Sequence, residues 1–203
     1  MPDQMKLYYD HYKDSFEQIK THTALRERYF SRAVILFSAS IFATFNPSYV
    51  QEISGAASKA QFGIDLNLAF YTISSLLTFL SLWYLTRYYQ SVLLIENLYT
   101  YIHQVESQLS AMLSPALITR EGTSYLSSYP LLKSFIHFFY FTFFPLIVII
   151  FSAIKGYWEI YHLSSTMPCV IAVFNIVCMA FIFVLTLLYL SWVHFKDFKK
   201  TYS

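Results

Sequence analysis

The chain has 203 residues, of which 56% are hydrophobic, 20% are aromatic and only 13% are charged. Soluble globular domains carry about 25% charged residues, so this composition excludes that class and predicts an integral membrane protein. The net charge of +2 comes without a basic tail of the kind that binds nucleic acid, so we expect no direct nucleic-acid partner.

Residues 1–32 predict an amphipathic helix on the cytoplasmic side of the membrane. The stretch from Asp3 to Arg32 contains no Pro or Gly, and its apolar side chains recur on one helical face. Its six basic and five acidic residues nearly balance, whereas a helix that lies on lipid normally has a strongly cationic polar face. A helix that packs on another helix is therefore the first interpretation, and a surface-bound helix is the alternative.

Residues 33–86 predict a transmembrane hairpin. The first span runs from Tyr29 to about Phe45 and ends before Pro47, because the residue preceding a proline avoids the helical conformation. Residues 49–62 are small and polar, so we expect a short outer loop there. The second span ends at Thr86, and its last 21 residues contain no charge, which suits the roughly 20 apolar residues that a bilayer core requires.

A stripe of hydroxyl residues follows one face of the second span, at Ser74, Thr78 and Ser81, and the fourth span carries a comparable polar residue, Asn175. Small hydroxyl residues let helices approach closely and form hydrogen bonds to each other. The same residues could instead line a pore in an oligomer, because the four helices of one protomer are too few to enclose a conduit. Both interpretations are open.

Residues 87–133 predict a cytoplasmic stalk helix and a loop. The chain has no Pro between Gly63 and Pro115, so the second span should continue as one helix to about residue 113. Beyond Arg87 the apolar residues recur at alternating steps of three and four, which is a heptad seam. The seam residues are Ile95, Leu98, Ile102, Val105, Leu109 and Met112. We expect this seam to pair antiparallel with the amphipathic helix of residues 1–32.

The loop after this helix contains the motif TREGTSYLSSYP, which begins at Thr119. A structural interpretation is that Thr119 caps a short helix with an acidic residue in its first turn. The alternative is a contact surface for a cytosolic protein partner or a trigger, formed by Glu96, His103, Glu106, Arg120 and Glu121. The sequence does not distinguish the two.

Residues 134–193 predict a second transmembrane hairpin. The third span is rich in aromatic residues, and Pro145 near its middle should kink it, because proline removes a helical hydrogen bond. We expect residues 155–168 to form the second outer loop, which would leave no acidic or basic residue deep within any span. The fourth span leads into a basic cytoplasmic tail, residues 194–203.

The distribution of Lys and Arg predicts the orientation. With both termini inside, twelve of these residues lie on the inner side, and only Lys59 and Lys155 lie in outer loops, as the positive-inside rule requires. The sequence therefore predicts an all-α, polytopic membrane protein. It would have four transmembrane helices, a cytoplasmic helical stalk and both termini in the cytoplasm.

The motifs that membrane enzymes use do not occur in the sequence. There is no HExxH motif or cluster of His and Cys for a metal, and neither a GxSxG nucleophile nor a Gly-rich phosphate loop. No pair of carboxylates falls within the predicted spans for acid-base catalysis. We therefore expect no enzymatic activity, no catalytic or metal-binding residue and no cofactor.

Two groups of segments carry a resemblance. They are YYDHYKDSFEQIK and ALRERYF before the first span, and RYYQ, IENLYTYIHQVESQL and ITREGTSYLSSYP after the second. Together they resemble small four-span bacterial membrane proteins of anti-phage defence loci, of the effector or CRISPR-accessory type. The resemblance carries no catalytic residue, and it implies an effector that compromises the inner membrane after a cytosolic sensor detects infection.

The functional expectation combines this resemblance with the stalk and the hydroxyl stripe. We expect an oligomeric, channel-like effector that disturbs membrane integrity when it is triggered through its stalk, with membrane lipid and further copies of itself as partners. The alternative is a membrane anchor or sensor scaffold that conducts nothing and docks a cytosolic protein on the stalk.

Overall fold

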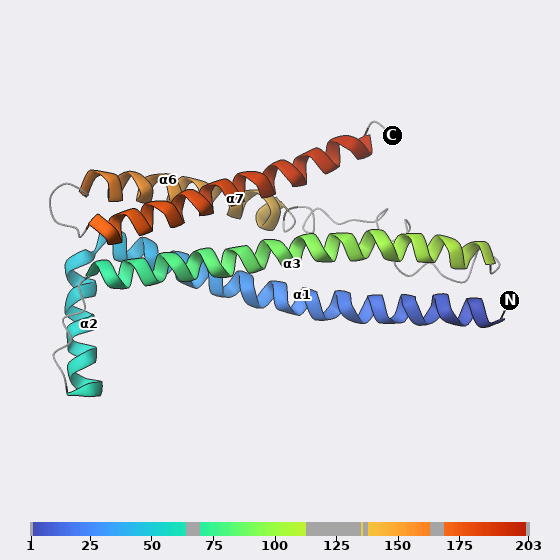
Figure 1. The fold of residues 1–203 in the computed structure, drawn as a ribbon, viewed down its shortest axis with the longest axis horizontal. Helices are drawn as coiled ribbons and strands as arrows, with labels where there is room; N and C mark the ends of the chain where they lie inside the picture. The colour runs from blue at the N-terminus through green and yellow to red at the C-terminus, as the bar shows by residue number, and fades with distance from the viewer. Residues whose placement is uncertain (1, 64–69, 113–134, 136–137, 163–168, 202–203) are drawn as a thin grey trace. The chain divides into compact units, whose positions relative to one another are not determined.

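The computed structural model describes residues 2–63, 70–112, 135, 138–162 and 169–201, and all of these except Asn46 and Gly63 are helical. These residues contain no strand, which confirms the predicted all-α class. The elements are α1 (Pro2–Phe45), α2 (Pro47–Phe62), α3 (Phe70–Met112), the π-helical turn η1 (Phe139–Phe143), α6 (Phe144–His162) and α7 (Cys169–Thr201) (Figure 1).

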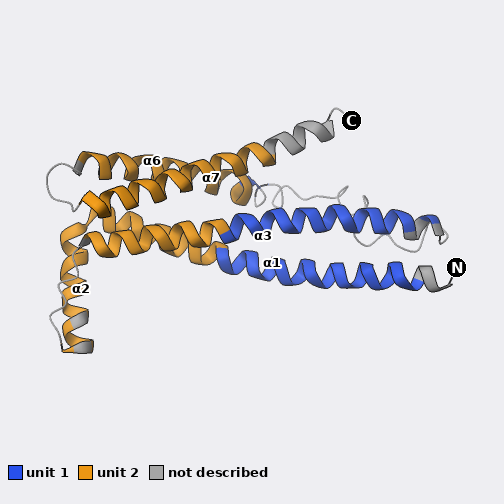
Figure 2. Ribbon diagram, in the orientation of Figure 1, with its two compact units in different colours: residues 1–29, 87–138 blue, residues 30–86, 139–203 orange. Residues whose placement is uncertain are grey.

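The helices form two compact units, which Figure 2 shows in different colours. Unit 1 consists of residues 1–29 and 87–138, and unit 2 consists of residues 30–86 and 139–203. Helices α1 and α3 are each divided between the two units, with one part in unit 1 and the other part in unit 2. The long helix predicted for residues 63–113 is confirmed over its described part, because α3 is continuous for 43 residues.

Unit 1 is an antiparallel pair made of the first part of α1 and the second part of α3, which run side by side (Figures 1 and 2). Three predicted seam residues of α3 are buried, Ile95, Ile102 and Val105, and Ile19 is buried on α1. The heptad pattern therefore marks the packed face of α3, as expected from its spacing. The side chains of Leu109 and Met112 lie outside the described residues.

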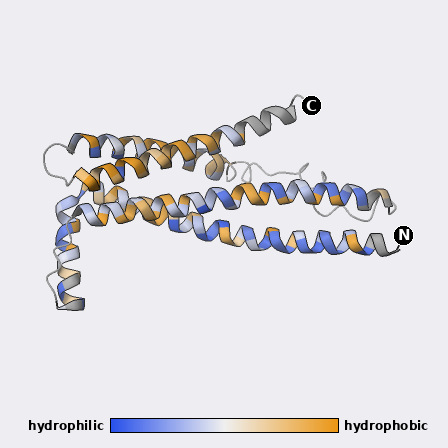
Figure 3. Ribbon diagram, in the orientation of Figure 1, coloured by the Kyte–Doolittle hydropathy of each residue, from blue (hydrophilic) through white to orange (hydrophobic). Residues whose placement is uncertain are grey.

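Unit 2 consists of the second part of α1, α2, the first part of α3, η1, α6 and α7. Helix α6 packs directly on α7. Its buried apolar side chains include Phe37, Leu85 and Ile182. Large apolar side chains also cover its outside, among them Phe181 and Leu188. Figure 3 shows that α6 and α7 are apolar along most of their described length, whereas the first part of α1 is largely hydrophilic.

Two segments of the described chain are long and apolar enough to cross a membrane, Phe139–Tyr161 and Cys169–Val193. A third is added if α1 and α2, which meet at an angle of 111°, form one bent span. These segments agree with the membrane class that the composition predicts.

Residues 49–62 do not form the expected outer loop, because they belong to helix α2. Pro47 occupies the start of this helix, where its fixed φ angle is favourable and its missing N–H is not needed. Gly63 ends the helix in a left-handed conformation with φ of 65°, and its N–H donates to the Lys59 carbonyl. A short polar segment between these two signals folds as a helix rather than a loop.

The helix of the predicted third span extends further than expected. Helix α6 continues through Lys155 to His162, so the outer loop predicted to begin at residue 155 is corrected. Pro145 is the second residue of α6, and α6 directly follows the π-helical turn η1. A proline lacks the amide hydrogen that the regular ladder needs, and a π-turn is a common local adjustment of that ladder.

Candidate functional site

A buried ion pair on α6 is the strongest candidate for a functional site. Lys155 and Glu159 lie one helical turn apart, and their side chains face the same side because they are four residues apart. The Lys155 Nζ atom is 3.1 Å from Glu159 Oε1, and both side chains have no exposed surface. Two opposite charges therefore lie inside a segment that is otherwise apolar enough to cross a membrane.

Two other helices provide hydroxyl groups to the ammonium group. Lys155 Nζ donates to Ser74 Oγ on α3 at 2.8 Å and to Thr44 Oγ1 on α1 at 3.5 Å. A lysine ammonium group has three donors, and the third donates to Glu159 Oε1. Each of its three hydrogens thus has an oxygen partner within 3.5 Å.

Helix α7 completes the site from the carboxylate side. Asn175 is fully buried, and its Nδ2 atom donates to Glu159 Oε1 at 3.1 Å. In the described part of the chain, Glu159 Oε2 and Asn175 Oδ1 are buried without a hydrogen-bond partner. We call these five residues, Thr44, Ser74, Lys155, Glu159 and Asn175, the Lys155 cluster; they come from α1, α3, α6 and α7 within unit 2.

The Lys155 cluster places charged and hydrogen-bonding groups inside helices that are otherwise apolar. Charged groups out of water are costly unless they are paired and hydrogen-bonded, and ionisable residues inside membrane segments commonly mark ion or proton pathways. The unpartnered oxygen of the Glu159 carboxylate and the Asn175 carbonyl oxygen can accept hydrogen bonds from a water molecule.

The predicted hydroxyl stripe lies inside unit 2. Ser74, Thr78 and Ser81 each have at most 1% of their surface exposed. Thr78 Oγ1 donates to the Ser74 carbonyl oxygen at 2.8 Å, whereas Ser81 Oγ is buried without a hydrogen-bond partner in the described structure. The structure brings Ser74 and Asn175 to the Lys155 cluster, where they contact opposite members of the ion pair.

The predicted trigger surface is only partly described. His103 Nδ1 lies 3.5 Å from Glu106 Oε2 on the same helix, and Glu106 is 7% exposed. Glu96 is half-buried on the preceding turns of α3. Arg120 and Glu121 lie outside the described residues.

The central residues of the cluster, Lys155 and Glu159, were assigned to an outer loop on sequence grounds. Both residues fall inside the candidate span Phe139–Tyr161, which continues into the predicted outer loop. One signal in the sequence could have identified them. Opposite charges at positions i and i+4, with the aromatic residue Trp158 between them and Tyr161 after them, are the pattern of a helix that continues past Gly156.

No family model matches the chain, and no curated protein or solved structure matches it either. In the part of the chain that the structure describes, no group of three or more His, Cys, Asp or Glu side chains is placed to hold a metal ion.

Proposed function

We propose that the protein is a four-span helical protein of the bacterial inner membrane with both termini in the cytoplasm. In this arrangement the four spans are the second part of α1, the first part of α3, α6 and α7. Unit 1 forms the cytosolic stalk. With Lys155 inside α6, the positive-inside pattern becomes sharper, because of the two basic residues first assigned to the outer side only Lys59 remains there.

We propose further that the protein acts as an oligomeric, channel-like effector that disturbs membrane integrity when a cytosolic event acts on its stalk. The resemblance to proteins of anti-phage loci suggests bacterial defence as the setting. The single observation that carries this proposal is the Lys155 cluster, since a protein that needed only to anchor itself would gain nothing from two charges in its apolar unit.

The geometry of the Lys155 cluster suggests how a conducting path through unit 2 would open. Its hydrogen bonds join different helices, so a movement of α1 or α3 would separate Thr44 or Ser74 from the Lys155 ammonium group. The freed polar atoms would then need water, because unpaired polar groups in an apolar interior are costly. Because α1 and α3 also form unit 1, an event at the stalk acts on the same helices.

The test is the membrane potential of bacteria that overproduce the protein, measured with a voltage-sensitive dye beside a chain truncated before Gly63. We expect the full-length protein alone to depolarise the cells. Glu159→Gln should change this depolarisation strongly, whereas Glu52→Gln, which removes an exposed carboxylate on α2, should not. A steady potential in cells, together with no ion flux in liposomes containing the purified protein, would refute conduction.

A second candidate is a membrane scaffold that conducts nothing and docks a soluble partner on unit 1. It is favoured by the hydroxyl stripe, because Ser74, Thr78 and Ser81 are buried within the protomer and suit close helix packing. The scaffold predicts that charge reversal at Glu96 abolishes partner binding while ion flux is absent in every state.

A further inference from the structure

A small cavity lies within unit 1 between the two paired arms. Its volume is about 190 Å³. Helix α1 contributes His22, Leu25 and Tyr29 to its wall, and α3 contributes Arg87, Gln90 and Ser91. Arg87 and Gln90 are exposed and Ser91 is buried, so exposed polar side chains form part of the cavity wall on α3.

Arg87 and Gln90 provide hydrogen-bond donors on the polar side of the cavity. Arg87 carries a permanent positive charge and five N–H donors. Its Nη1 atom donates to Gln90 Oε1 at 3.4 Å, an arrangement that leaves the Gln90 amide hydrogens as donors toward a ligand. The Ser91 hydroxyl donates to the Arg87 carbonyl oxygen at 2.9 Å. No Asp or Glu is among the described residues that line the cavity, so its chemistry favours an oxyanion.

The size of the cavity selects the kind of anion. Pockets that enclose drug-sized ligands have volumes of roughly 300–1,000 Å³, so about 190 Å³ is too small for a whole nucleotide. A phosphate group fits this space if the remainder of the ligand lies outside the cavity. An arginine guanidinium group suits phosphate because its planar donors match the phosphate oxygens.

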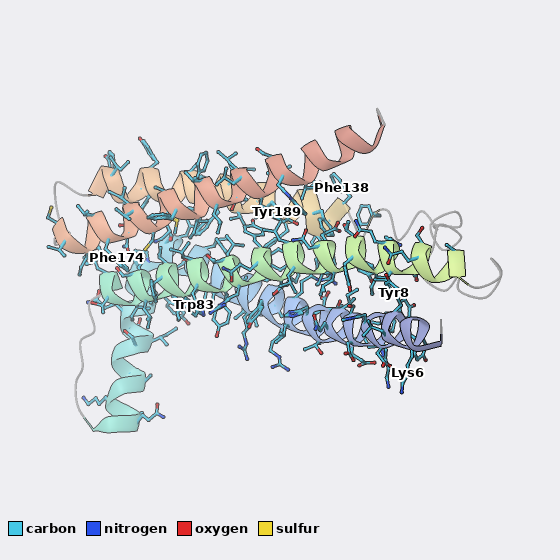
Figure 4. All side chains as sticks on the ribbon, turned by 45° about the vertical axis from the view of Figure 1, so that its right-hand side comes forward. Lys6, Tyr8, Trp83, Phe138, Phe174 and Tyr189 are labelled. Carbon is cyan, nitrogen blue, oxygen red and sulfur yellow. The ribbon has the colours of Figure 1, made fainter. Side chains whose placement is uncertain are left out.

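The position of Arg87 along α3 identifies the source of the phosphate. Arg87 is the first charged residue after the uncharged stretch of residues 70–86. One turn earlier, Trp83 is 50% exposed and is labelled on α3 in Figure 4. Tryptophan is enriched where a membrane helix meets the lipid headgroups. On α1, Arg28 and Arg32 flank the cavity residue Tyr29 in sequence and add positive charge there, whereas Arg26 is paired with Glu27.

We propose that this cavity binds the phosphate of an anionic glycerophospholipid at the cytoplasmic face of the membrane. The lipid joins the arms of α1 and α3 at the level where each arm leaves the apolar unit. This proposal shares with the proposed function the placement of the apolar part of α3 in a bilayer, but it does not depend on conduction.

The experiment uses the full-length protein in detergent micelles and measures lipid binding by native mass spectrometry and by the thermal unfolding midpoint. The probes are dioleoyl phosphatidylglycerol, dioleoyl phosphatidylcholine and inorganic phosphate. We expect phosphatidylglycerol to bind more tightly than phosphatidylcholine, and Arg87→Gln to weaken it by about tenfold. Arg28→Gln removes an exposed arginine of the same region that does not line the cavity, and it should change the affinity by less than about twofold.

Equal phosphatidylglycerol affinity in the Arg87→Gln and wild-type proteins would overturn the proposal, as would equal affinities for the two lipids. Stabilisation by millimolar inorganic phosphate alone, lost in Arg87→Gln, would overturn the lipid assignment in favour of a soluble anion. The helical circular dichroism of each variant confirms that it is folded. Loss of ion flux with lipid binding intact would refute conduction and leave this proposal standing.

Discussion

Replacing Lys155 alone with methionine should destabilise the protein far more than replacing Lys155 and Glu159 together. In the single variant the Glu159 carboxylate stays buried and keeps only the Asn175 amide as a hydrogen-bond donor. Removing one partner of a buried ion pair costs about 3–5 kcal/mol, whereas replacing both partners by apolar residues of similar volume is often neutral. Each kcal/mol lowers the unfolding midpoint of a protein of this size by about 2–4 °C.

The assay is thermal unfolding of the purified protein in detergent, followed by circular dichroism. The expected fall in midpoint is about 6–20 °C for Lys155→Met, a comparable fall for Glu159→Met, and recovery of most of this loss in the double variant. Lys59→Met and Glu52→Met form the control pair, because both residues are exposed on α2 and their effects should be small and additive.

The reasoning would be refuted if the single variants Lys155→Met and Glu159→Met unfolded within about 1 °C of the wild type. A buried charge without its ion-pair partner would then not lower the stability of the protein. It would also be refuted if the two substitutions were additive, because two residues whose charged atoms lie 3.1 Å apart must be coupled.

Two further predictions concern the helix pair of unit 1 and the end of α2. Ile102→Ala should lower the free energy of unfolding by about 2–5 kcal/mol, because Ile102 is fully buried in the seam. Tyr101→Ala on the exposed side of the same turn should cost less, and equal losses in a denaturant titration would contradict the assigned face. Gly63→Ala should destabilise by about 1–2 kcal/mol, because Gly63 has a φ angle of 65° that residues with a Cβ atom adopt only with strain. Gly55→Ala should instead stabilise by about 0.5–1 kcal/mol, since Gly55 is helical and a Cβ atom there would meet nothing within 4 Å; a shift of the same sign in both variants would refute this assignment.

Local patterns in the sequence predicted most of the helical architecture. The spacing of Ile95, Ile102 and Val105 identified the buried face of α3, because helical periodicity alone decides which side chains share a face. The stretch without Gly or Pro predicted the continuous helix through Arg87. The helix at residues 47–62 was missed because its small and polar composition suggested a loop, although Pro47 and Gly63 are ordinary signals for the start and end of a helix.

The sequence by itself determined the helical class, the apolar segments and the packed face of α3, because these properties depend on residues close together in the chain. Only the tertiary structure decided that Lys155 and Glu159 are buried. Lys155 takes its hydroxyl partners from Thr44 and Ser74, 111 and 81 residues away, and the carboxylate takes its amide partner from Asn175. Whether a charge can remain in an apolar interior depends on such distant partners, because without them the cost of desolvation would expel it.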